Sequence, residues 1–146
     1  LETFGGLDHR AQWLGEVGGV TYINDSKATN VGACQAALAG MEQPVILIAG
    51  GDGKGADFRV LREVVAKTVK AAVLMGRDAE RLESALADIV RVVRVENMQE
   101  AVTAAHELAQ PGDVVLLAPA CASLDQYRDY QERGRIFSEA MQRLNA

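Results

Sequence analysis

Short β-rich runs alternate with longer helix-forming stretches along almost the whole chain, and this alternation restricts the fold more than any other feature. The runs rich in Val, Ile and Leu are residues 20–23, 45–49, 71–75, 92–95 and 114–118. The stretches with helical spacing are residues 31–39, 58–68, 79–89, 98–109 and 124–144. Strands that alternate with helices of about ten residues are typical of βαβ units, which build a mostly parallel sheet.

Two local patterns refine this expectation. The continuous apolar run Val114–Leu117 suits a strand that is covered on both faces of a sheet. Gly18 and Gly19 separate two β-rich runs near the start of the chain, which predicts a hairpin turn. We therefore expect an α/β fold: a Rossmann-like three-layer sandwich whose mostly parallel sheet has one antiparallel edge strand or hairpin near the N-terminus.

The composition excludes several classes of protein. A chain of 146 residues fits a single domain, here residues 1–146. The net charge of −5 and an aromatic content of 5% argue against nucleic-acid binding as the main function. No apolar run approaches the roughly 18 residues of a membrane helix, and no signal peptide is visible. Cys34 and Cys121 form no CxxC pair, and the Asp and Glu residues show no metal-ligand spacing, so we expect reduced thiols, a cytoplasmic location and no metal site.

Polar and glycine-rich segments follow the predicted strands, whereas the turns at the other strand ends are ordinary. These segments are residues 24–30, 50–57, 76–78 and 119–126. In an open α/β sheet, ligands bind outside the carboxyl ends of the strands, where such loops share one edge. The side chains expected to converge there are Asp25, Lys27, Thr29, Asp52, Lys54 and Ser123.

Several of these residues also have a structural interpretation. Thr29 or Asn30 can cap the helix that follows, and Asp57 can cap the next one. Ser123 with Gln126 three residues later has the pattern of a capping box.

The two lysines have no evident structural task, and we expect them to bind an anion. Lys27 lies just before a predicted helix N-terminus, where backbone N–H groups and the helix dipole favour a carboxylate or phosphate. The glycines around Lys54 suit either a plain strand-to-helix turn or a close approach to a ligand, and their spacing is not that of a Walker A loop. Cys121 is not expected to be a nucleophile because neither His lies near it in the sequence, and His106 is expected to be solvated or partly packed.

Four motifs resemble the C-terminal domain of the Mur ligases that add D-glutamate. They are residues 6–10 (GLDHR), 24–30 (NDSKATN), 50–54 (GGDGK) and 119–126 (PACASLDQ), and the resemblance covers essentially the whole chain in order. The second motif differs from that of other Mur ligases and of folylpolyglutamate synthetase, which tend to carry a His there. Asp8 stands where the family usually has Pro, and Tyr130 where it usually has Phe.

This resemblance implies the last part of a three-domain bacterial enzyme of peptidoglycan synthesis. The N-terminal UDP-binding domain and the central ATP-binding domain are missing from this chain, in agreement with its first residue, Leu1, and its lack of a P-loop. In the reaction that the resemblance implies, ATP phosphorylates UDP-N-acetylmuramoyl-L-alanine and the amine of D-glutamate attacks the acyl phosphate. ATP and Mg²⁺ are then bound mainly by the central domain, the complete enzyme is a monomer, and this chain alone is inactive.

The resemblance also implies roles for individual residues, none of them a nucleophile. The expected D-glutamate contacts are Lys27, Thr29, Lys54, Ser123 and Tyr130. Arg10 is expected to contact the phosphates of ATP and Asp25 its ribose, while His9 and Asp52 belong to the site without an assigned role.

Two other functions are compatible with the residues alone: a self-contained binding module for a small anion or nucleotide, and a domain of a related ligase with another amino acid. The gene sequence upstream of Leu1 discriminates the module from the ligases, because a ligase requires a P-loop domain in frame.

Overall fold

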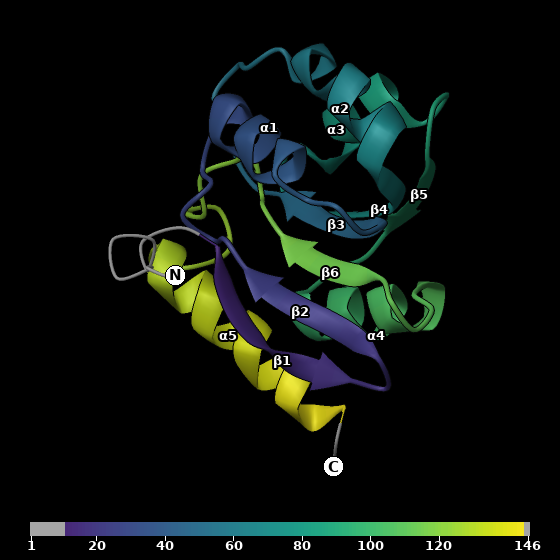
Figure 1. Ribbon diagram of the computed structural model, residues 1–146. Helices are drawn as coiled ribbons and strands as arrows, with labels where there is room; N and C mark the ends of the chain where they lie inside the picture. Colours follow the sequence, from purple (N-terminus) through teal and green to yellow (C-terminus); the bar gives the residue numbers. More distant parts are fainter. Residues whose placement is uncertain (1–10, 145–146) are drawn as a thin grey trace.

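The computed structural model describes residues 11–144, which form an α/β fold of three layers (Figure 1). The central sheet has 6 strands in the order β1-β2-β6-β3-β4-β5. The strands are β1 (Gln12–Val17), β2 (Val20–Asn24), β3 (Val45–Gly50), β4 (Val69–Met75), β5 (Arg91–Arg94) and β6 (Val114–Leu117). The helices are α1 (Val31–Ala39), the 3-10 helix η2 (Phe58–Leu61), α2 (Arg62–Thr68), α3 (Ala79–Leu86), α4 (Met98–Leu108) and α5 (Tyr130–Arg143).

The sheet is parallel except at one edge, as the sequence predicts. β1 pairs antiparallel with β2, and the other neighbouring strands pair in parallel. Gly18 and Gly19 form the predicted hairpin turn with φ values of +59° and +83°. Both central residues of a type I′ turn need positive φ, which explains why two glycines stand there.

Both faces of the sheet are buried, and helices cover each of them. Figure 1 shows α1, α2 and α3 on one face and α4 and α5 on the other. All residues of β3 are buried. Leu47 packs in the cluster that contains residues of α1, η2, α2 and α3, whereas Ile48 packs in the cluster with α4 and α5. A strand that is buried on both sides needs an unbroken apolar run, which explains the apolar sequences of β3 and β6.

Two predicted helix caps are confirmed and one predicted helix start is wrong. The Asn30 side chain accepts a hydrogen bond from the Ala33 N–H at 2.8 Å, and Asp57 caps η2. The last helix begins at Tyr130 rather than at residue 124. Its cap is Asp129, whose Oδ1 accepts a hydrogen bond from the Glu132 N–H at 2.8 Å.

The segment expected to open that helix is a turn instead. The carbonyl of Ser123 accepts hydrogen bonds from the N–H groups of Gln126 and Tyr127, at 3.1 and 2.9 Å. The predicted capping box of Ser123 and Gln126 is therefore wrong. The physical reason is that residues in this turn bind neighbouring loops: Asp125 accepts a hydrogen bond from the Arg77 N–H, and Gln126 donates one to the carbonyl of Glu96.

Candidate functional site

The loops that follow β2, β3, β4 and β6 lie side by side at the carboxyl edge of the sheet. Backbone hydrogen bonds join them. The Asp25 N–H donates to the carbonyl of Leu117 at 2.8 Å, and the Ala120 N–H donates to the carbonyl of Ala28 at 2.9 Å. Asp52 and Ala122 exchange two backbone hydrogen bonds, of 3.0 and 2.8 Å. These contacts bring the predicted loops together at one edge.

Glycines allow three of these loops to pack backbone against backbone. A Cβ atom on Gly50 would lie 1.8 Å from the carbonyl oxygen of Met75. A Cβ atom on Gly51 would lie 2.3 Å from the carbonyl oxygen of Ala122, and one on Gly76 would lie 2.7 Å from the nitrogen of Gly51. All three glycines have positive φ, a conformation that other residues adopt at a cost. Gly50 and Gly51 are therefore explained by the close approach of neighbouring segments, whereas Gly55 has no atom within 4 Å of its Cβ position and is explained by its φ of +78°.

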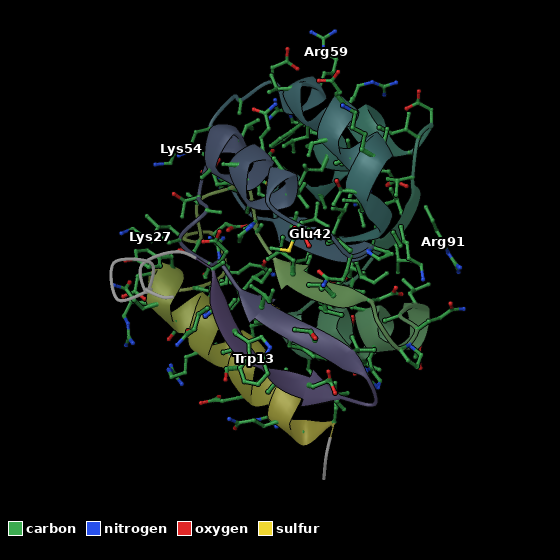
Figure 2. All side chains as sticks on the ribbon, viewed as in Figure 1. Trp13, Lys27, Glu42, Lys54, Arg59 and Arg91 are labelled. Carbon is green, nitrogen blue, oxygen red and sulfur yellow. The ribbon has the colours of Figure 1, made fainter. Side chains whose placement is uncertain are left out.

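Lys27 and Lys54 extend from the same edge of the molecule in Figure 2. Both side chains are exposed, and neither forms an ion pair with another residue of the described range 11–144. Lys54 has a φ of 52°, in the left-handed region that a residue with a side chain rarely adopts. Two ammonium groups with no ion-pair partner among residues 11–144 therefore stand at the carboxyl edge of the sheet.

Of the other predicted binding residues, Thr29 and Ser123 lie in these loops, and Tyr130 lies on α5. Thr29 is half-buried and is not the cap of α1, because Asn30 has that role. Ser123 is 4% exposed, at the start of the turn that follows β6. Tyr130 is the first residue of α5, and together with Lys27 it lines a groove of about 610 Å³ between β1 and α5.

Of the two residues expected to contact ATP, Asp25 lies in the part of the chain that the structure describes and Arg10 does not. Asp25 is 7% exposed and directly follows β2. Arg10, His9 and Asp8 lie outside the described residues.

Arg133 was not among the predicted site residues, yet its side chain contacts the loop that carries Lys27. It lies on α5, is 2% exposed, and its Nε donates to the Ser26 hydroxyl at 3.1 Å while its Nη2 donates to the Ser26 carbonyl at 3.0 Å. The Ser26 hydroxyl in turn donates to the carbonyl of Tyr130 at 2.6 Å. Burial lowers the pKa of Arg133 to about 10, so the guanidinium stays charged at neutral pH. Its position four residues before the buried Phe137 is the helical spacing that could have revealed it.

Carboxylates at this edge organise the loops. The Lys54 N–H donates to Asp52 Oδ1 at 2.9 Å, and the Gly53 N–H donates to Asp78 Oδ2 at 2.7 Å. Within residues 11–144, no group of His, Cys, Asp and Glu side chains is arranged to hold a metal ion.

The two cysteines are buried in the core, and His106 contacts another side chain of the fold. Cys34 and Cys121 are buried free thiols, and burial raises the pKa of Cys121 to about 12, which disfavours the thiolate that a nucleophile needs. His106 is half-buried, with Nδ1 2.7 Å from the hydroxyl of Tyr22.

None of the helices between residues 11 and 144 combines the length and the apolar character that crossing a membrane requires.

Comparison with known proteins gives one family. The family model described as "Mur ligase, glutamate ligase domain" matches residues 9–121. The UDP-N-acetylmuramoylalanine–D-glutamate ligase of Methylococcus capsulatus is 62% identical over 144 residues, which are 99% of this chain and 31% of that protein. The protein of the same name from Pseudomonas syringae pv. tomato is 56% identical, over 99% of this chain and 33% of its own length. The chain thus spans about a third of the length of these curated relatives.

Solved structures share the fold at low sequence identity. A murein peptide ligase from Psychrobacter arcticus superimposes with a TM-score of 0.63 and 13% identity, over 94% of this chain and 29% of that one. A UDP-N-acetylmuramate–alanine ligase from Thermotoga maritima gives a TM-score of 0.57 and 14% identity, over 87% of this chain and 28% of that one. This likeness supports the three-layer fold.

Proposed function

The chain belongs to the Mur ligase family, in which it matches the glutamate ligase domain, and on that premise we propose that it is the D-glutamate-binding domain of a UDP-N-acetylmuramoylalanine–D-glutamate ligase. The complete enzyme joins D-glutamate to UDP-N-acetylmuramoyl-L-alanine in the cytoplasm during peptidoglycan synthesis. It works as a monomer and uses ATP through an acyl-phosphate intermediate. This domain supplies D-glutamate contacts and closes over ATP in the complete enzyme, and on its own it performs no reaction.

The observation that carries the proposal is the pair of exposed lysines at one edge of the sheet. D-Glutamate has two carboxylates, and Lys27 and Lys54 supply two ammonium groups without competing ion pairs among the described residues. Hydrogen bonds to charged groups contribute about 1.5–3 kcal/mol each, about twice the value for neutral groups. Two such contacts select a dicarboxylate over a monocarboxylate.

The remaining residues orient the amino acid for attack. Thr29 and Ser123 donate hydroxyl hydrogen bonds to the carboxylates, and the ring of Tyr130 packs beside the aliphatic part of the substrate. The chemistry is attack of the substrate's own amine on an acyl phosphate, with phosphate as the leaving group. Positioning these two groups in a closed cleft supplies the rate enhancement, so no side chain of this domain acts as a nucleophile.

ATP reaches this domain from a neighbouring part of the complete enzyme. Asp25 contacts the ribose and Arg10 the phosphates, whereas Mg²⁺ and most of the nucleotide are held outside this chain. His9 belongs to the same region, and Asp52 acts through its hydrogen bond to the backbone of Lys54.

A hybrid ligase tests the proposal. In this hybrid ligase, the segment of the Methylococcus capsulatus enzyme that matches this chain is replaced by this chain. We expect phosphate release that depends on D-glutamate, ATP and UDP-N-acetylmuramoyl-L-alanine. Lys27→Ala and Lys54→Ala should each raise the KM for D-glutamate about tenfold or more, the equivalent of one lost charge-assisted hydrogen bond.

Lys67→Ala is the matched control. Lys67 is exposed near the end of α2, directly before β4 begins, and thus lies at the opposite edge of the sheet. Its replacement should leave the KM unchanged. Unchanged KM values for both Lys27→Ala and Lys54→Ala would remove the proposed site. Phosphate release with another amino acid in place of D-glutamate would identify a different ligase, and no release with any amino acid would favour a binding module.

A further inference from the structure

Asp78 stands at the N-cap position of α3 but does not cap that helix. Its side chain makes no capping hydrogen bond there. Asn97 and Asp129, which have the same position before α4 and α5, do cap their helices through the side chain. The carboxylate of Asp78 instead accepts a hydrogen bond of 2.7 Å from the N–H of Gly53, in the loop that follows β3. A favourable local contact is therefore replaced by one between two loops.

The neighbours of Asp78 hold its carboxylate in this orientation. The side chain of Asp78 is 14% exposed, and Nη1 of Arg81 lies 3.5 Å from its Oδ2. The guanidinium of Arg81 also lies over the ring of the buried Phe58, 4.9 Å from its centroid. The backbone N–H of Asp78 donates to the carbonyl of Gly51 at 3.0 Å, which adds a second contact to the same loop.

Gly53 is shaped for this contact. A Cβ atom there would lie 2.4 Å from Cζ of Phe58 and 3.2 Å from Oδ2 of Asp78. A side chain at this position would push the loop away from both groups. The residue type at 53 is therefore explained by the approach of its backbone to Asp78 rather than by its φ angle.

The contact ends one residue before a functional side chain. Lys54 has a φ of 52°, in the left-handed region that is sterically strained for a residue with a Cβ atom. The N–H of Gly53 binds Asp78 and the N–H of Lys54 binds Asp52, so two successive amides are fixed by carboxylates. Arg77, next to Asp78, holds Asp52 through a contact of 3.3 Å between Nη1 and Oδ2. Residues at the end of β4 thus fix the backbone from which Lys54 extends.

We propose that Asp78 is a positioning residue, which sets the place of the Lys54 ammonium by binding the amide of Gly53. This inference rests on the proposed function, because it takes Lys54 as a ligand of D-glutamate. Loss of the hydrogen bond between Gly53 and Asp78 lets the backbone at residues 53 and 54 leave its strained conformation. The Lys54 ammonium then spends less time beside the carboxylate of D-glutamate. The bound substrate, once in place, still meets the acyl phosphate in the same way.

The hybrid ligase defined above provides the test. Asp78→Ala should raise the KM for D-glutamate about fivefold, the equivalent of one lost hydrogen bond, with kcat within about twofold of the parent. Asp78→Asn should restore most of the affinity, because the amide oxygen still accepts a hydrogen bond from Gly53. Asp78→Glu keeps the charge beside Arg81 but moves the carboxylate by one methylene, and it should raise the KM as Ala does. This variant keeps the test valid if Asp78→Ala lowers the yield of folded enzyme.

Asp57→Ala is the matched control in the same loop. Asp57 binds the N–H of Arg59 and caps η2, so its loss destabilises the loop end without touching Gly53. We expect a lower Tm and an unchanged KM. Equal KM increases for Asp57→Ala and Asp78→Ala, or a parental KM for Asp78→Glu, would show that Asp78 has only a structural role. If Lys54→Ala raises the KM and Asp78→Ala does not, the inference is wrong and the proposed function stands. If Lys54→Ala has no effect, the inference is wrong, and the proposed function then depends on the result for Lys27→Ala.

Discussion

Arg133 on helix α5 donates two hydrogen bonds to Ser26, the residue that precedes Lys27 in the loop after β2. The two residues are far apart in the sequence, and both are buried. Because Ser26 also donates to the carbonyl of Tyr130, the start of α5 and the loop that carries Lys27 form one hydrogen-bonded unit. The guanidinium thus acts on the site through the loop backbone.

Replacement of Arg133 by Lys should therefore destabilise the fold. An ammonium keeps the charge but cannot donate to the Ser26 hydroxyl and carbonyl in the same planar geometry. We expect the free energy of unfolding to fall by about 2 kcal/mol, measured by urea denaturation. Arg135→Lys, on the exposed side of the same helix, should change it by less than about 0.5 kcal/mol. Equal losses in the two variants would contradict the role given to Arg133.

The left-handed backbone of Lys54 makes glycine the better replacement there. Lys54→Gly and Lys54→Ala both remove the ammonium, but only Ala keeps a Cβ atom at φ 52°. We expect Lys54→Gly to be more stable than Lys54→Ala by about 1 kcal/mol, while both variants of the hybrid ligase lose affinity for D-glutamate equally. Urea denaturation and the KM for D-glutamate give the two measurements. A lower stability for the glycine variant would mean that the loop does not hold this conformation.

The hydrogen bond between Tyr22 and His106 should contribute measurably to stability. The hydroxyl lies 2.7 Å from Nδ1 of the His, and Tyr22 is 0% exposed. Tyr22→Phe should lower the free energy of unfolding by about 1 kcal/mol, because a half-buried ring nitrogen loses its partner. A double-mutant cycle with His106→Ala isolates this coupling, and a coupling energy of zero would assign the effect to packing alone.

Asp88 should give the fold a component of stability that acid removes. Its hydrogen bonds to the Arg62 guanidinium hold the pKa of the carboxyl below its usual value. A carboxyl with a lowered folded-state pKa stabilises the fold at all pH values above its unfolded-state pKa. This stabilisation is lost as the pH falls through the folded-state value.

The corresponding experiment compares the parent with Asp88→Asn. The difference in Tm between them should be largest at neutral pH and should shrink as the pH falls below about 4. Arg62→Gln should flatten the acid dependence in the same way, because it removes the partner. A difference that persists unchanged at pH 2 would show that the ion pair is not its source.

Most of the fold could be predicted from local patterns. The strands that form the middle of the sheet are buried on both faces, so their sequences are unbroken apolar runs, and α1 matches its predicted range from Val31 to Ala39. The start of α5 could not be predicted from its pattern, because Ser123 and Gln126 have cap-type spacing. What decides the outcome is contacts with distant residues, among them the hydrogen bond from the Arg77 N–H to Asp125.

The site was predictable as a set of loops but not as a set of contacts. The rule that ligands bind at the carboxyl ends of parallel strands places Lys27 and Lys54 at one edge. It says nothing about Arg133, which follows the last strand by more than a dozen residues on a helix with many charged neighbours. Asp78 likewise has the sequence of an ordinary helix cap, and only the coordinates show that its carboxylate binds Gly53 instead.

The glycines at positions 50, 51 and 76 have a practical consequence for protein engineering. Their backbones lie in contact with those of neighbouring segments, so the loops around them form one tightly packed platform. A Cβ atom at any of the three positions would clash with a neighbouring backbone and push the loops apart. Attempts to redirect the domain to a different amino acid should leave this platform intact. Libraries should instead diversify the outward tips, Lys27 and Lys54, where new side chains meet solvent rather than neighbouring main chain.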